Sequence, residues 1–324
     1  MAELYNEKIK EEFLSQYPEG TSETYRYVFY RSKDTEDVIG RDLYTFSSEE
    51  ILSVIKASNH TTINAIRHTW NIIKLYLTWA SKYSGSNINV AENITMDELR
   101  NCLDKSKKLY ITEEELIDIE NSAANAQDIV GLRLIFEGVG GFQLSEICNL
   151  RFSDVNWNNN ILKLKDDKLG DERELVVSDK CISIIKSAYN QEVYLKSNGE
   201  STARNPEAML QETDYIVKNI QTSLNKNVHG IDRHTLYRRI SVLSEAYELP
   251  YLTPKNVEKS GMIKMGYDLY KESGKLEIEE LTKIAQRFNI RKIKINGAMR
   301  YNFQTLKEFV NLENIKELYL NDEK

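Results

Sequence analysis

The 324-residue chain has few of the residues that build disulfide frameworks, metal centres or membrane spans. Its three cysteines (Cys102, Cys148 and Cys181) lie far apart without CxxC spacing, and its four histidines form no HExxH pair. This usage is typical of a reduced compartment and argues against a zinc site. No run approaches the ~18 consecutive apolar residues of a spanning helix, and the first ten residues lack the apolar stretch of a secretory signal. We expect a cytoplasmic protein with no metal, no cofactor and no membrane contact.

Positive charge is in deficit overall, because 43 lysines and arginines face 50 aspartates and glutamates, for a formal net charge of −7. An acidic chain taken alone disfavours a nucleic-acid partner, but phosphate binding depends on the local potential. Residues 218–307 contain 17 basic and 9 acidic side chains, and residues 281–307 contain seven basic side chains and no acidic one. This distribution is compatible with DNA binding and equally with a solvated basic face that has no partner.

Proline is scarce too, with four residues, and the first 100 residues are predicted to be helical. Ser47 followed by Glu50 is a capping signature that predicts a helix over 47–57. Apolar residues at helical spacing predict a long amphipathic helix over 61–83, ending before Gly85. With a shorter helix expected over 22–31, these elements predict a compact helical domain over residues 1–100.

The second half is predicted to be a mixed domain over residues 112–324, joined to the first by a linker at 101–111. A helix starts after the cap Thr112, and two apolar helices lie within 129–150, separated by a glycine-rich turn at 138–141. Residues 151–179 alternate apolar and polar side chains, which predicts two or three short antiparallel strands before helices resume at 180–195. The expected fold class is mainly α with a small antiparallel β-sheet.

The order of these parts resembles the tyrosine recombinases, or phage integrases, over most of the chain. The larger domain of that family opens on a Leu-Thr-x-x-Glu helix, which YITEEEL (110–116) matches. Its Thr-Gly-x-Arg-x-x-Glu-x-x-x-Leu segment and strand entry are matched by GGFQLSEICNL (140–150) and RFSDV (151–155). The resemblance implies a helical, SAM-like core-binding domain followed by a recombinase-like domain.

The catalytic set of the family is degraded in this chain. Two arginines, a lysine, a histidine and a second histidine or tryptophan activate a phosphate there, and a tyrosine attacks it. The matching positions are Gln143 for the first arginine, Lys168 or Lys165 for the strand lysine, Lys255 for the histidine, Glu258 for the second arginine, and Tyr301 as the remaining tyrosine. Losing one charge-stabilising donor costs about 10²–10³ in rate, so we expect no enzymatic strand exchange.

The segment HGIDRHT (229–235) superficially resembles the catalytic box of the family. Its spacing is one residue too long, and it precedes a whole predicted helix over 236–247. We interpret it as the start of a helix capped by Asp232 or Thr235, whose basic residues reach phosphates or base edges. A capped and solvated surface helix is the alternative.

Candidate DNA-contacting side chains share a polar or cationic head on a predicted helix face or in the basic C-terminal region. Asn and Arg can read adenine and guanine edges, while Thr and Lys can hold phosphates. The candidates are Thr62, Asn64, Arg67, Lys74, Arg233, His234, Tyr237, Arg238, Arg239, Lys255, Arg291, Lys292, Lys294 and Arg300, with Thr61 and His68 beside the first group. A solvated polar face remains the alternative for each group, and Trp70 and Trp79 are expected in the core.

Within the family, the degraded set is similar to that of repressors from SPβ-type Bacillus phages. That resemblance implies a sequence-specific transcriptional repressor that binds operator elements in double-stranded DNA and maintains lysogeny in a bacterial host. An active recombinase with an atypical site using Tyr301, and an adaptor whose basic face meets an acidic protein, are the alternatives. A protein co-repressor or anti-repressor and the oligomeric state stay open. The amphipathic segment 304–324 is expected to form a helix that packs on its own chain or on a neighbouring copy.

Overall fold

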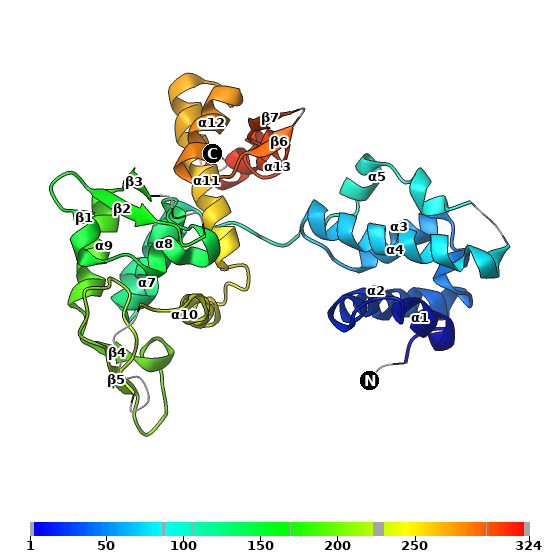
Figure 1. Cartoon of the computed structure of the whole chain (residues 1–324), viewed down its shortest axis with the longest axis horizontal. Helices are drawn as coiled ribbons and strands as arrows, with labels where there is room; N and C mark the ends of the chain where they lie inside the picture. The colour runs from blue at the N-terminus through cyan, green and yellow to red at the C-terminus, as the bar shows by residue number, and fades with distance from the viewer. Residues whose placement is uncertain are drawn as a thin grey trace. The chain divides into compact units, whose positions relative to one another are not determined.

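The computed structural model describes residues 3–85, 88–104, 106–168, 170, 172–222, 230–295 and 297–320. The chain divides into two compact units, Met1–Lys108 and Leu109–Lys324. The fold is mainly α-helical with small antiparallel sheets, as expected from the sequence, and Figure 1 shows its elements.

The first unit is a helical bundle of α1 (Glu7–Leu14), α2 (Glu19–Ile39), α3 (Ser48–Ala57), α4 (Ile63–Ser84) and α5 (Met96–Arg100). The helices predicted over 47–57 and 61–83 are confirmed, and the capping box between Ser47 and Glu50 opens α3. The apolar face of α4 is buried with Ile66, Ile73 and Ala80 fully inside, and Trp70 and Trp79 pack against this core.

Helix α2 is longer than the predicted 22–31 because polar residues form part of its buried face. Glu36 is fully buried and pairs with the buried Lys10 at 2.6 Å. The Glu36 carboxylate also accepts hydrogen bonds from the Ser32 hydroxyl at 2.9 Å and the Leu43 amide at 2.7 Å. A buried charge is tolerated when it is paired and hydrogen-bonded. The apolar pattern alone therefore predicts a helix that ends too early.

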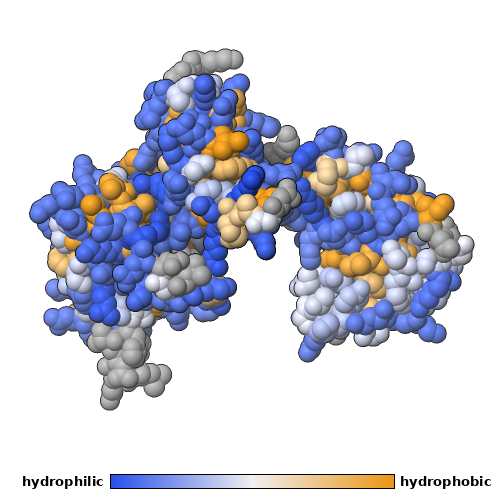
Figure 2. All heavy atoms as spheres, turned by 45° about the horizontal axis from the view of Figure 1, so that its top comes forward, coloured by the Kyte–Doolittle hydropathy of each residue, from blue (hydrophilic) through white to orange (hydrophobic). Residues whose placement is uncertain are grey.

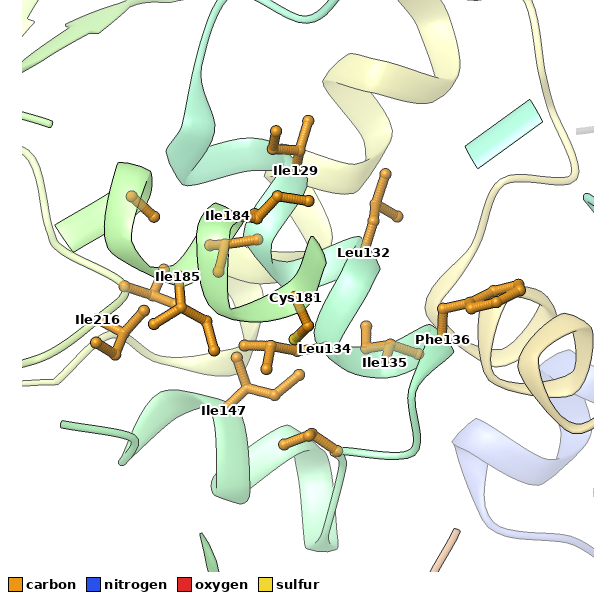
Figure 3. Packing of buried hydrophobic residues seen from close by; sticks show 14 of the residues in the cluster. Ile129, Leu132, Leu134, Ile135, Phe136, Ile147, Cys181, Ile184, Ile185 and Ile216 are labelled. Atoms are coloured by element: carbon orange, nitrogen blue, oxygen red, sulfur yellow. The ribbon is translucent and has the colours of Figure 1, made fainter. Parts of the chain in front are cut away.

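The second unit begins with α6 (Glu113–Ser122), α7 (Ala126–Phe136) and α8 (Ser145–Cys148). The strands β1 (Val155–Asn156), β2 (Ile161–Lys165) and β3 (Glu172–Val176) then form one antiparallel sheet in sequence order, which confirms the predicted strands. After it come α9 (Asp179–Asn190), the hairpin of β4 (Val193–Leu195) and β5 (Glu207–Met209), and α10 (Arg233–Ala246). Figure 3 shows the side chains of α7 and α9 facing one another, with Ile147 and Ile216 closing the cluster.

The unit ends with α11 (Pro254–Ser273), α12 (Ile278–Arg287), the hairpin of β6 (Ile293–Ile295) and β7 (Ala298–Arg300), α13 (Phe303–Lys307) and α14 (Leu312–Ile315). Helix α11 crosses α7 very closely at Gly261, where a Cβ atom would clash with the Phe136 carbonyl oxygen. The hairpins β4–β5 and β6–β7 were not predicted from the sequence.

The C-terminal segment corrects the prediction of one helix over 304–324. Residues 308–311 separate α13 from α14, and the Asn311 side chain caps α14 by accepting from the Asn314 amide at 2.9 Å. Ile315 is fully buried, and Tyr319 stacks on Tyr267 of α11, so the described tail packs on its own chain. Residues 321–324 of the predicted helix lie outside the described residues.

The cysteines, the helices and the acidic, histidine and cysteine side chains bear on the disulfide, membrane and metal classes. All three cysteines are buried free thiols. Within the described residues, no helix is both long and apolar enough to cross a membrane, and no three or more His, Cys, Asp or Glu side chains are placed to hold a metal ion. The faces visible in Figure 2 are mainly hydrophilic, with small hydrophobic patches on each unit.

Candidate nucleic-acid interface

The loop between α7 and α8 carries Gln143, which the sequence pattern predicts at the position of the family's first arginine. Gln143 and Leu144 both adopt left-handed backbone conformations, with φ of 57° and 63°. Two buried carboxylates hold the loop: Glu146 accepts from the Gly140 amide at 2.8 Å, and Asp166 accepts from the Phe142 amide at 2.6 Å. The Gln143 side chain is exposed. Two buried carboxylates therefore hold the loop, and it presents a neutral amide to solvent.

The turn between β2 and β3 places Lys168 next to this loop. The same Asp166 carboxylate accepts from the Lys168 amide at 2.8 Å. The Lys168 ammonium lies 4.6 Å from the centre of the exposed Phe142 ring. Lys165, the alternative strand lysine, instead lies 3.9 Å from Glu172 on the neighbouring strand. The structure thus brings Lys168 together with the residue preceding Gln143.

The first turns of α11 carry Lys255 and Glu258, which the sequence pattern predicts at the positions of a catalytic histidine and the second arginine. Thr253 caps the helix and Pro254 opens it, which leaves Lys255 exposed and Glu258 half-buried. Burial raises the pKa of Glu258, while the nearby Lys255 and Lys259 oppose that rise. Among the described residues, no cation lies within ion-pair distance of Glu258. A carboxyl at this position repels a phosphate when ionised, where the family's arginine would attract it.

Tyr301 follows β7 and is half-buried. The Lys292 ammonium lies 5.2 Å from the centre of its ring, and the ring of Phe303 lies 5.9 Å away. In the described part of the chain, no hydrogen bond or ion pair connects Tyr301 with Gln143 or Glu258.

Helix α10 presents a basic face at its N-terminal end. Asp232 caps it by accepting from the Thr235 amide at 2.9 Å, as one of the two predicted caps. His234, Tyr237 and Arg238 are exposed, and Arg233 is half-exposed. The predicted segment 229–235 therefore opens a surface helix, although His229 lies outside the described residues.

The prediction that Arg239 contacts DNA is wrong, because only 4% of this residue is exposed. Its guanidinium donates to Gln127 Oε1 at 2.9 Å and to the Lys218 carbonyl at 2.7 Å. Nε lies 3.6 Å from Asp128, and the group sits over the Tyr194 ring at 5.3 Å. These partners use the donors of Arg239 inside the protein, so it is not available to DNA.

Helix α4 of the first unit has an outer face without any acidic residue. Asn64, His68 and Asn71 are exposed at spacings of four and three residues, which places them on one stripe. Arg67 donates to Asn64 at 3.3 Å, and the Lys74 ammonium lies 3.7 Å from the centre of the Trp70 ring.

The remaining candidates on α4 take different positions. Thr62 is the N-cap and accepts from the Ala65 amide at 3.3 Å, so its hydroxyl has a structural role. Thr61 is half-exposed beside it. Asn71 was missed by the sequence reasoning, although its spacing of seven residues from Asn64 would have placed it on the same face.

The basic C-terminal group lies on and before the β6–β7 hairpin. Arg291, Lys292, Lys294 and Arg300 are all exposed. Within the described residues, no carboxylate lies within ion-pair distance of any of the four.

Two family models together match most of the chain. The model described as MrpR, N-terminal core-binding domain matches residues 4–82, and the model described as MrpR, C-terminal catalytic domain matches residues 110–320. The chain is 35% identical to the SPbeta prophage-derived uncharacterized protein YopR of Bacillus subtilis strain 168, over 98% of this chain and 97% of that protein. It is 28% identical to the tyrosine recombinase XerA of Pyrococcus horikoshii, over 62% of this chain and 64% of that protein.

Solved structures of recombinases also match. The crystal structure of the XerA recombinase covers 99% of both chains with a TM-score of 0.41 and 14% identity. A Tn1549 transposon integrase in complex with transposon right end DNA covers 95% of this chain and 97% of that chain, with a TM-score of 0.44 and 11% identity. With both of its domains matched and a relative aligned along nearly its whole length, this chain belongs to the MrpR family and has the two-domain fold of tyrosine recombinases.

Proposed function

We propose that this protein is a sequence-specific DNA-binding repressor that maintains phage lysogeny in the cytoplasm of a bacterial host. The protein would bind double-stranded operator DNA through its two recombinase-like domains and would not exchange DNA strands. The observation that carries the proposal is the pairing of two features: exposed basic surfaces remain, while Gln143 and Glu258 stand at the two arginine positions. The prophage origin of the relative YopR supports the setting.

The electrostatics of the altered positions supports the loss of chemistry. Phosphoryl transfer is catalysed by positive groups that face the charge developing on the phosphate. Gln143 supplies no charge, and a carboxylate about 4 Å from a phosphate would repel it by roughly 4 kcal/mol at an effective dielectric of 20. The raised pKa of Glu258 softens this repulsion but does not turn it into attraction. Lys168 still places a positive charge beside the loop.

The two helix faces supply complementary modes of recognition. The stripe of Asn64, His68 and Asn71 on α4 carries amide and imidazole groups that suit base edges in a major groove. The first turns of α10 add Arg233 and Arg238 close to a helix N-terminus, where backbone amides and cations together suit phosphate. Repression then follows from tight occupancy of an operator.

Binding-site selection from fragmented phage DNA tests the proposal. The expected result is one enriched sequence element that binds far more tightly than random duplex, with an affinity that falls steeply as salt rises. The Asn64→Ala and Asn71→Ala double variant should lose preference for that element while keeping its binding to random duplex. If wild-type protein enriches no element, the proposed function is wrong.

An active recombinase with an atypical site is the second candidate, favoured by the retained Lys168 and Tyr301. It predicts a covalent protein–DNA adduct on a nicked substrate that carries the selected element, and Tyr301→Phe would abolish that adduct. We expect no adduct from wild-type protein under conditions in which the element is fully bound. A nicked-substrate assay with an active tyrosine recombinase is the matched positive control.

A further inference from the structure

The β6–β7 hairpin is a short antiparallel ribbon whose side chains are exposed on both faces. Its register pairs Lys294 with Met299, and Ile293 with Arg300. Residues opposite one another in an antiparallel pair point to the same face, and neighbours along a strand point to opposite faces. Lys294 and Met299 therefore share one face, and Ile293 and Arg300 share the other.

The alternation places cations on both faces. Lys292 lies two residues before Lys294, and its contact with the Tyr301 ring continues the same register. Arg291 lies two residues before Ile293, and the same alternation continued beyond β6 would place it on the face of Arg300. None of these four cations has a carboxylate within ion-pair distance among the described residues, and residues 281–307 contain no acidic residue. Each face of the ribbon thus carries two cations that the described part of the chain leaves unneutralised.

The hairpin also exposes apolar side chains that its own unit does not cover. Met299 is 62% exposed and Ile293 is 45% exposed, on opposite faces. A two-stranded hairpin is only marginally stable by itself. Here Ile290 before the hairpin and Phe303 after it pack against the apolar cluster of α11 and α12 and anchor its base. The base of the hairpin is therefore anchored, while the cations on its two faces take no part in that packing.

We propose that the β6–β7 hairpin stands in a groove of duplex DNA, with each face directed at one of the two sugar–phosphate backbones. A ribbon that lies flat on one backbone contacts phosphates with one face and needs cations on that face alone. A ribbon between two backbones contacts phosphates with both faces and needs cations on both faces. The apolar Met299 and Ile293 side chains then contact the sugars of the walls. This inference rests on the proposed DNA-binding function and assigns the hairpin the task of holding phosphates rather than reading bases.

The hairpin lies away from α10 within the second unit. Figure 1 shows the hairpin beside α12 and α13, at the end of α11 away from α10. Contacts made by the hairpin would add to the phosphate contacts of α10. Phosphate contacts do not depend on the base sequence. The hairpin should therefore contribute equally to operator DNA and to random duplex.

Salt titrations of paired variants test the proposal. Each neutralised phosphate contact contributes about 0.9 to the slope of log affinity against log salt concentration. Lys292→Gln with Lys294→Gln should lower the slope by about 2, and Arg291→Gln with Arg300→Gln should lower it by about 2 as well. The quadruple variant should lower it by about 4 and weaken operator and random duplex by the same factor. Because these side chains are exposed, thermal unfolding should stay close to that of wild type.

The matched control removes four other exposed lysines from the second unit: Lys186, Lys271, Lys275 and Lys316, each changed to Gln. Its slope should stay within about 1 of the wild-type slope. If one pair accounts for the whole change, the ribbon lies flat and the groove proposal is wrong. If neither pair changes the slope, or the control changes it as much, the hairpin does not bind DNA. Both of those results leave the proposed function standing, because it fails only if wild-type protein itself shows no salt-dependent, sequence-selective binding.

Discussion

The cations inside the second unit and the cations on its surface differ in what neutralises them. Arg133 is 1% exposed, with Nε 2.7 Å from Glu120, and Arg173 lies 2.7 Å from Glu146. Arg239 is held by the Gln127 amide, the Lys218 carbonyl and Asp128. Arg238, the residue next to it in the chain, is exposed. Arg239 is thus buried with fixed partners. Arg238 is exposed, and no carboxylate of the described residues lies within ion-pair distance of it.

This difference changes how the charge of the chain is interpreted. The basic excess over residues 218–307 includes Arg239, and it includes Lys264, whose ammonium lies 2.8 Å from Asp268 and 3.1 Å from Glu113. It also includes Arg287, which donates to the Val176 carbonyl at 3.1 Å. The positive charge on the surface of this region is therefore smaller than the sequence count. The β6–β7 hairpin and the residues just before it carry four of the exposed cations.

The largest expected effect comes from Arg239→Met. The substitution removes the cation that lies 3.6 Å from Asp128 and the donor to the buried Lys218 carbonyl, and breaking a buried ion pair in this way typically costs about 3–5 kcal/mol. Urea unfolding at 25 °C measures the loss. Arg238→Met is the matched control one residue away, and its free energy of unfolding should change by less than about 0.5 kcal/mol. Equal losses in the two variants would contradict the division into interior and surface cations.

The next largest effect concerns the surface cations of α10 in place of the interior arginine. Arg233→Ala with Arg238→Ala should weaken operator binding by about 1–3 kcal/mol for each arginine that contacts a base edge. If both hold phosphates instead, the salt slope should fall by about 2. Fluorescence anisotropy at several salt concentrations separates these results. Unchanged DNA affinity would favour the adaptor whose basic face meets an acidic protein.

The sequence could have separated Arg238 from Arg239. Leu236, Ile240 and Leu243 are buried at helical spacing, and position 239 lies on the same face. The partners of Arg239 could not have been predicted, because Gln127 lies 112 residues earlier in the chain. Local periodicity thus predicts which face a side chain occupies, whereas its hydrogen-bond partners depend on the tertiary fold.

The hairpin and the tail show the same limit of local signals. Ile293 and Ile295 alternate with Lys292 and Lys294, a period of two that is typical of a strand, but a run this short does not by itself predict the hairpin. The tail was predicted as one helix from its amphipathic pattern, and the cap at Asn311 divides it. Long periodic helices such as α4 were predicted well because many residues repeat one signal. Short elements depend on one or two residues.

A smaller effect is expected at the loop between α7 and α8, where Gln143 presents an exposed neutral amide. Gln143 has a φ of 57°, and β-branched residues are strongly disfavoured in this region. Gln143→Val should therefore lower the free energy of unfolding by about 1–2 kcal/mol, whereas Gln143→Gly should leave it unchanged or raise it by up to about 1 kcal/mol. Urea unfolding of both variants measures the difference. Equal stabilities would mean that the loop relaxes out of the left-handed conformation.

The smallest effect concerns the carboxylate that accompanies the interior arginine. Burial raises the pKa of Asp128 from its ordinary 3.8 to about 6, although Arg239 opposes the rise. The native state then binds the proton more tightly than the unfolded chain does, so this contribution to stability is present at low pH and is lost as the pH rises through about 6. Between pH 5 and pH 7 the loss should be about 1 kcal/mol.

The Asp128→Asn variant cannot titrate and should lack this loss. Its side-chain amide keeps an oxygen that can accept from Asn125 Nδ2, which lies 3.1 Å from the Asp128 carboxylate in the wild type. Unfolding by urea at the two pH values measures the difference between the proteins. A constant difference would mean that Arg239 holds Asp128 ionised across the whole range, and the interior pair would then resemble an ordinary strong ion pair rather than one weakened by its own burial.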